Sequence, residues 1–173
     1  MKTIHLIWRR SSWLCVVVCL YAFSSYSAFA DTRIAILNFE LKDTTLLPQT
    51  PEELERTASM KPLLEKFLKS TDGYELVRIN SDAQLEANAG FGYLFNHPDA
   101  TADLGNKFGA DWVVVGRIHK PSFLFVYFMV HLVNVKTQRL VGNYVIEVKG
   151  PQKKLTEKGV EYLAKQIDKT IKP

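Results

Sequence analysis

Residues 109–150 form the stretch that most limits what this chain can fold into. Three runs rich in valine, phenylalanine and tyrosine occur there, at residues 111–119, 122–135 and 139–148. β-Branched and aromatic side chains favour extended chain, and the connection at residues 136–138 is short enough for a hairpin. The stretch therefore predicts three consecutive strands of one sheet, with the last two antiparallel.

The strand predicted over residues 122–135 is apolar on both of its faces. Strands of this kind are usually covered by helices on both sides. The alternative is that one face stays open as an aromatic surface for a partner. The sequence leaves both alternatives open. The candidate residues of a partner surface, on this strand and on a second segment, are Phe123, Phe125, Tyr127, Met129, Phe91 and Tyr93.

The remaining pattern predicts helices packed on a mixed sheet of about five strands, an α/β (α+β) fold. A first strand is expected at residues 33–41, with Ala35, Leu37, Phe39 and Leu41 on one face. The helix that opens at Thr50 or Pro51 is expected to kink at Pro62, or to restart there with Ser59 as its cap. The expected order is β-α-β-α-α-β-β-β-α, with the other elements at residues 74–79, 81–89, 99–109 and 153–172.

Residues 1–30 have the composition of a secretory signal peptide. Three basic residues precede an apolar run at residues 13–23, and Ala28 and Ala30 supply the small side chains that a signal peptidase reads. The run breaks before the roughly 20 apolar residues that a transmembrane helix needs. We predict cleavage after Ala30, an exported single domain over residues 31–173, and no membrane span once the signal is removed.

Loss of this leader changes the chemistry available to the chain. Both cysteines, Cys15 and Cys19, lie within it, so the exported part has no disulfide and no thiolate. Three of the 22 basic residues and none of the 18 acidic residues also lie within it, which leaves 19 against 18. A balance this even provides no basic surface for nucleic acid. Neither a nucleophile elbow nor a dinucleotide loop is present, so we expect a protein that is not an enzyme and has no cofactor.

Histidines supply the weak candidates for a metal site. His97 lies with Asp99 in an irregular segment, residues 90–100, that is rich in glycine and aromatic residues. His119 and His131 lie on successive predicted strands and could meet across the sheet, in a register that the sequence does not fix. Histidine and carboxylate side chains bind transition metals, although a site usually needs three or four ligands. A turn and a packed sheet edge are the alternative readings.

Three segments carry a family resemblance. They are RIAILNFEL at residues 33–41, LGNKFGADWVVVGRI at residues 104–118, and KPSFL at residues 120–124 with the hairpin that follows. Together they resemble a family of bacterial periplasmic proteins with a domain of unknown function, often encoded beside quinoprotein alcohol dehydrogenases of methylotrophs. The fold is similar to the N-terminal domain of TolB and to the periplasmic part of CsgG. Many members have a cysteine pair where this chain reads FNHPDA at residues 95–100.

The resemblance extends over essentially all of residues 31–173 and implies a function without catalytic residues. It implies a periplasmic accessory or interaction protein with a protein partner in the cell envelope, a quinoprotein alcohol-oxidation system or another one. A metal- or small-ligand-binding protein that uses the segment around His97 is the alternative. A homodimer is also left open.

Overall fold

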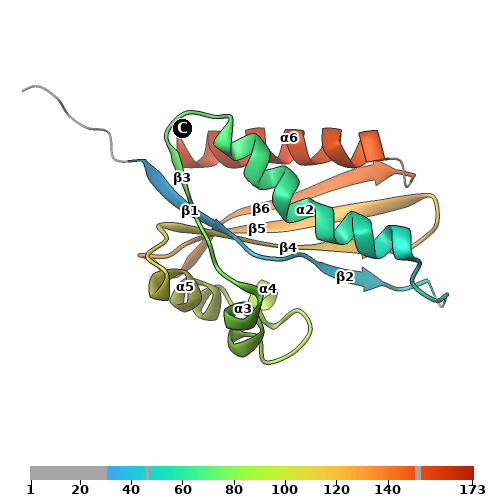
Figure 1. Cartoon of the computed structure of the whole chain (residues 1–173), viewed down its shortest axis with the longest axis horizontal. Coiled ribbons are helices and arrows are strands. Elements are labelled where there is room, and N and C mark those ends of the chain that lie inside the picture. The colour runs from blue at the N-terminus through green and yellow to red at the C-terminus, as the bar shows by residue number, and fades with distance from the viewer. Residues whose placement is uncertain (1–30, 46, 151–152) are drawn as a thin grey trace, which may run out of the picture. The chain divides into compact units, whose positions relative to one another are not determined.

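A computed structural model of the chain describes residues 31–45, 47–150 and 153–173 (Figure 1). The predicted signal peptide lies outside these residues. The described part is a mixed six-stranded sheet with helices packed on it, which confirms the predicted fold class. In chain order the elements are β1 (Thr32–Ile36), β2 (Glu40–Asp43), α2 (Pro51–Lys69), β3 (Tyr74–Val77), α3 (Ser81–Ala87), α4 (Tyr93–Asn96), α5 (Pro98–Lys107), β4 (Trp112–Lys120), β5 (Phe125–Asn134), β6 (Arg139–Lys149) and α6 (Lys153–Ile171).

The sheet has the strand order β3-β1-β4-β5-β6, and β2 also pairs with β4. β1 runs parallel to both of its neighbours, β3 and β4, because helical segments connect these strands. β4, β5 and β6 follow one another as an antiparallel meander. The antiparallel pairing predicted for the last two strands is thus confirmed, and the same arrangement extends back to β4.

The single strand predicted over residues 33–41 is wrong, because the chain bulges in its middle. Ile36 pairs with Val114, whereas Glu40 pairs with Arg117, so four steps along this chain match three along β4. At the bulge, the Asn38 backbone N–H donates to Gln84 Oε1 at 2.8 Å, and Gln84 Nε2 donates to the Asn38 carbonyl at 3.0 Å. The extra residue switches the faces of everything that follows it.

The switch of faces separates side chains that the sequence pattern had grouped. Ala35 and Leu37 pack in the core beneath α3, α4 and α5. Phe39 and Leu41 pack on the opposite side of the sheet, with the core beneath α2 and α6. The prediction that these four residues share one face of a single strand is therefore wrong.

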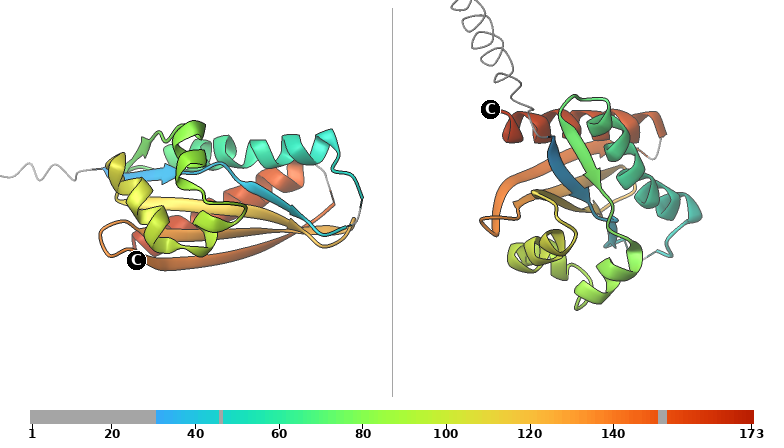
Figure 2. Two further views of the ribbon diagram at one scale, coloured as in Figure 1. Left: turned by 90° about the horizontal axis from the view of Figure 1, so that it is seen from below. Right: turned by 60° about the vertical axis from the view of Figure 1, so that its left-hand side comes forward.

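Two long helices run along one face of the sheet, and three short helices cover the other face only at one end. α2 and α6 lie together on the first face, whereas α3, α4 and α5 gather over one end of the second (Figures 1 and 2). Side chains of β5 that point toward α2 and α6 are buried, among them Phe128 and Val130. Side chains on its other face stay partly exposed from Phe125 to His131. The second face is therefore open at the β4–β5 turn.

α2 is continuous from Pro51 to Lys69, so the predicted restart at Pro62 is wrong. Thr50 and Glu53 form a capping box at its start, which satisfies two of the free N–H groups of the first turn. The Ser59 hydroxyl caps nothing and donates to the Arg56 carbonyl at 2.7 Å. None of the helices in the described ranges combines the length and the apolar character that a membrane crossing requires.

Candidate functional site

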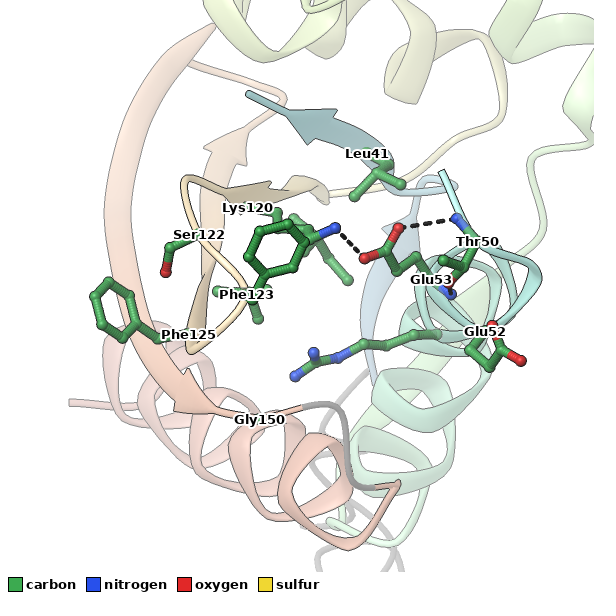
Figure 3. Close-up of a pocket in the computed structure, with 12 residues that line it drawn as sticks. Leu41, Thr50, Glu52, Glu53, Lys120, Ser122, Phe123, Phe125 and Gly150 are labelled. Atoms are coloured by element: carbon green, nitrogen blue, oxygen red, sulfur yellow. Dashed lines mark hydrogen bonds and ion pairs between the residues drawn. The ribbon is translucent and has the colours of Figure 1, made fainter. Parts of the chain in front are cut away.

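A pocket of about 340 Å³ lies at the end of the sheet where β4 turns into β5 (Figure 3). It is bounded by the first turns of α2 on one side and by Gly150 on the other. Its apolar wall is formed by Leu41, Ile118, Phe123, Phe125 and Val126. Its ionised side chains are Glu52, Glu53, Arg56 and Lys120.

Lys120 is a buried cation with two carboxylate partners. Its side chain is 7% exposed, and its Nζ lies 3.1 Å from Asp43 Oδ2 and also contacts Glu53 Oε1. Glu53 is held from the other side, because the Thr50 backbone N–H donates to its Oε2 at 3.0 Å (Figure 3). Asp43 is held by the Thr45 backbone N–H at 2.8 Å and the Thr45 hydroxyl at 2.7 Å. These contacts join β2, β4 and α2 at the pocket.

The electrostatics of the Lys120 cluster (Asp43, Glu53 and Lys120) favour fixed charges. Burial alone would lower the pKa of Lys120, but the hydrogen bonds to Glu53 and Asp43 outweigh it and raise that pKa. Burial would raise the pKa of Asp43, and the hydrogen bonds from Thr45 and Lys120 outweigh it and lower that pKa. Both shifts favour the charged forms. A general acid or base needs a pKa near the working pH, and the shifts of Lys120 and Asp43 move both groups away from it. The contacts of the cluster tie β2, β4 and α2 together.

Arg56 lines the same pocket from α2 without an ionic partner. Its guanidinium makes no salt bridge or hydrogen bond to any residue that the structure describes, and its Nε and Nη2 atoms are buried. The guanidinium carbon lies 5.4 Å from the centre of the Phe128 ring, which gives a cation–π contact. Burial lowers the pKa of Arg56, and the charge of Glu53 partly opposes that shift.

Apolar side chains next to the pocket are exposed. Phe123 and Leu124, in the β4–β5 turn, are 64% and 73% exposed. Phe125 and Tyr127 then follow on the outer face of β5, with ring centres 6.0 Å apart. Met129 comes next on this face, opposite Val145 of β6, which is 56% exposed.

The structure thus places three predicted partner-surface residues, Phe125, Tyr127 and Met129, on one open face, with Phe123 at its edge. We call Phe125, Tyr127, Met129 and Val145 the open face. The other two candidates belong to the segment before α5. Phe91 is 61% exposed, and Tyr93 stacks on His97 with ring centres 4.2 Å apart.

The four predicted metal candidates have separate surroundings. His97 Nδ1 lies 2.8 Å from the Tyr93 carbonyl, and Asp99 is exposed in the first turn of α5. His131 Nδ1 lies 2.9 Å from the Phe95 carbonyl, and His119 Nδ1 lies 3.4 Å from the Lys42 carbonyl. Across residues 31–45, 47–150 and 153–173, no three histidine, cysteine or carboxylate side chains are grouped so that they could hold a metal ion. Metal binding through His97 stays a prediction.

Residues 90–100 are fastened to the sheet by a network that the sequence did not reveal. Glu40 accepts hydrogen bonds from the Gly92 backbone N–H at 2.9 Å and from Asn88 Nδ2 at 3.1 Å. The Phe95 ring lies between the Arg117 guanidinium and the His131 ring, 3.8 Å from each. Burial and the charge of Arg117 lower the pKa of His131, against the hydrogen bond to Phe95. This segment is therefore part of the packed structure.

A signal for the Lys120 cluster was present in the sequence. Val114, Gly116 and Ile118 alternate onto the face that α2 and α6 cover, and Lys120 continues the same alternation. A lysine at that position predicts a buried cation, which needs carboxylate partners. For the unpaired state of Arg56 the sequence contains no comparable signal.

Comparisons with known proteins connect the chain to one family and one fold. The family model DUF3280, described as protein of unknown function (DUF2380), matches residues 32–167. No curated protein matches the chain in sequence. TolB from Acinetobacter baumannii is 18% identical, with a TM-score of 0.52 over 82% of this chain and 28% of TolB. The PelC dodecamer from Paraburkholderia phytofirmans is 12% identical, with a TM-score of 0.50 over 83% of this chain and 89% of PelC.

A third similar structure is the LpoB C-terminal domain from Escherichia coli, 11% identical, with a TM-score of 0.48 over 76% of this chain and 92% of that domain. The matches to TolB and PelC, at identities this low, show a shared fold and nothing about activity or partners. The predicted fold similarity to TolB is confirmed.

Proposed function

This chain belongs to the DUF3280 family of proteins of unknown function, and from that premise we propose that it is a non-enzymatic periplasmic accessory protein that binds a protein partner of the cell envelope. The observation that supports this proposal is the open face. Phe125 and Tyr127 are only partly buried and continue into the exposed Phe123 and Leu124 at the start of β5. Met129, at the other end of the open face, packs against the edge of the core beneath α3, α4 and α5.

The open face has the chemistry of a protein interface. Aromatic residues and methionine are enriched at the centres of such interfaces, and fully burying one large apolar side chain contributes about 1.5–3 kcal/mol. Val145 and the β4–β5 turn extend the apolar surface on either side of Tyr127. β6 is an edge strand of the sheet, so a partner that covers this face also has access to the edge.

Two further points support an accessory role over catalysis. The ionised groups Asp43, Lys120 and Glu53 are paired with one another and hold β2, β4 and α2 together. The sequence of residues 1–30 favours export, so residues 31–173 would be the mature periplasmic domain. The partner system that we propose, from the family resemblance, is a quinoprotein alcohol-oxidation system or another envelope complex.

The experiment is affinity capture from the periplasm of the source bacterium, with the tagged protein as bait. Val145→Arg places a charge on the open face at a side chain that is 56% exposed, so the fold should tolerate it. Tyr162→Arg is the matched control, because Tyr162 is 54% exposed and lies on α6. We expect a partner that the wild type and Tyr162→Arg capture and that Val145→Arg loses at least tenfold. Capture of the same proteins by all three would contradict the proposal.

A further inference from the structure

Arg56 is a charged group in need of a hydrogen-bond acceptor. A buried polar group without a partner loses its hydration and gains nothing in return. The Nε and Nη2 atoms of Arg56 are both buried and have no hydrogen-bond partner among the described residues. The contact with the Phe128 ring offsets part of the charge but accepts no hydrogen bond in the plane of the guanidinium.

The two atoms without partners specify the shape of the missing acceptor. Nε and Nη2 form one edge of the guanidinium, and their N–H bonds point outward side by side. That edge matches the two oxygens of one carboxylate, the bidentate pairing for which arginine is preferred over lysine. The unmet requirement is therefore for a carboxylate and not for a single carbonyl oxygen.

The two carboxylates that lie against Lys120 are already engaged, and Glu52, which also lines the pocket, is exposed. Asp43 and Glu53 both bind Lys120, and Glu53 also caps α2 through Thr50. Taking either of them for Arg56 would leave Lys120 buried with one partner. An acceptor from outside the chain can satisfy Arg56 without that loss.

We propose that the pocket binds a small carboxylate with an apolar tail, whose carboxylate pairs with Arg56 and whose tail lies against Ile118, Val126 and Phe123. A volume of about 340 Å³, at about 30 Å³ for each water-sized group, holds roughly ten non-hydrogen atoms. Nε and Nη2 are covered in this structure, so the side chain turns toward the pocket on binding. This rotation of the Arg56 side chain breaks no hydrogen bond, because Nε and Nη2 make none to the described residues.

This ligand site goes beyond the proposed partner binding and does not depend on it. The probe is octanoate, titrated into the purified protein by calorimetry, with 1-octanol and octylammonium as neutral and cationic probes of similar length. We expect octanoate to bind at least tenfold more tightly than either, because only the carboxylate offers the guanidinium two acceptor oxygens and the opposite charge. Equal binding of octanoate and octanol, or no octanoate binding at millimolar concentration, would overturn the proposal.

Variants then locate the binding. Arg56→Met should reduce octanoate affinity at least tenfold, while Lys66→Met, which removes a 65% exposed cation from the same helix, should not change it. If Arg56→Met does not fold, Phe123→Ala tests the pocket wall at an exposed side chain and should weaken octanoate severalfold. Unchanged affinity in the folded Arg56 variant, or in Phe123→Ala, would refute the assignment. Val145→Arg should bind octanoate normally, which separates this site from the open face.

Discussion

Removing the buried cation of the Lys120 cluster is the sharpest test of how the hairpin end of the sheet is held together. The substitution Lys120→Met keeps a long apolar side chain and deletes the charge. Asp43 and Glu53, whose side chains are 5% and 20% exposed, would then face each other without the cation between them. The variant should lose stability because two carboxylates stay in a poorly hydrated place.

The magnitude follows from the burial of the three groups. Removing one partner of a buried ion pair costs about 3–5 kcal/mol. The pocket lies beside Glu53 and lets water reach part of that side chain, so we expect the lower end, about 3 kcal/mol. Lys66 provides the comparison, because it pairs with Glu157 at 3.4 Å while its side chain is 65% exposed. Lys66→Met should cost about 0–1 kcal/mol.

Urea unfolding at pH 7, followed by circular dichroism, measures both free energies of unfolding. The triple variant Lys120→Met, Asp43→Asn, Glu53→Gln should recover part of the loss, because it removes the uncompensated charges as well. If Lys120→Met costs no more than Lys66→Met, the cluster is solvated and our account of it is refuted. In the wild type, the contribution of Asp43 is present above its ordinary pKa of 3.8 and is lost as the pH falls toward its lowered folded-state pKa.

Two further predictions concern the second face of the sheet and the bulge. The fold lowers the pKa of His131, so the unfolded chain takes up the proton first as the pH falls below the ordinary value of 6.5. Thermal unfolding should therefore show that the wild type loses stability between pH 7 and pH 5. The variant His131→Gln should lose less. An equal loss in both would point to other groups. A Cβ on Gly116 would overlap the Phe39 ring beside the bulge; Gly116→Ala should therefore cost about 1–3 kcal/mol in urea unfolding, and a neutral result would mean that Phe39 repacks freely.

Strand composition and the short connection at residues 136–138 were sufficient to predict the three strands β4 to β6 and the antiparallel pairing of β5 with β6. The residues of β5 alternate between a covered face and an open one, and the sequence presented both faces as equally apolar. What decides between them is the length of the helical layer on the second face, which ends at α5 and the Phe95–His131 stack. How far a helix extends along a strand depends on tertiary packing, which the local sequence pattern does not reveal.

The bulge between β1 and β2 escaped prediction for a related reason. Residues 33–41 contain no glycine or proline, and Ala35, Leu37, Phe39 and Leu41 keep a spacing of two, so they indicate one continuous strand. The Gln84 side chain, from a helix distant in sequence, stabilises the bulge because it hydrogen-bonds the Asn38 backbone in place of a strand neighbour. One inserted residue then turns Phe39 and Leu41 to the α2 side, and β2 brings Asp43 to Lys120.

These connections explain why several ionised side chains lie at the end of the sheet where β4 turns into β5. The bulge aims Asp43 at Lys120, and the capping box of α2 adds Glu53 to the same cation. Both carboxylates are held there, and Arg56, one turn further along α2, makes no hydrogen bond or ion pair with a residue that the structure describes. A ligand that satisfies this guanidinium therefore does so without disturbing the contacts that hold the sheet to α2.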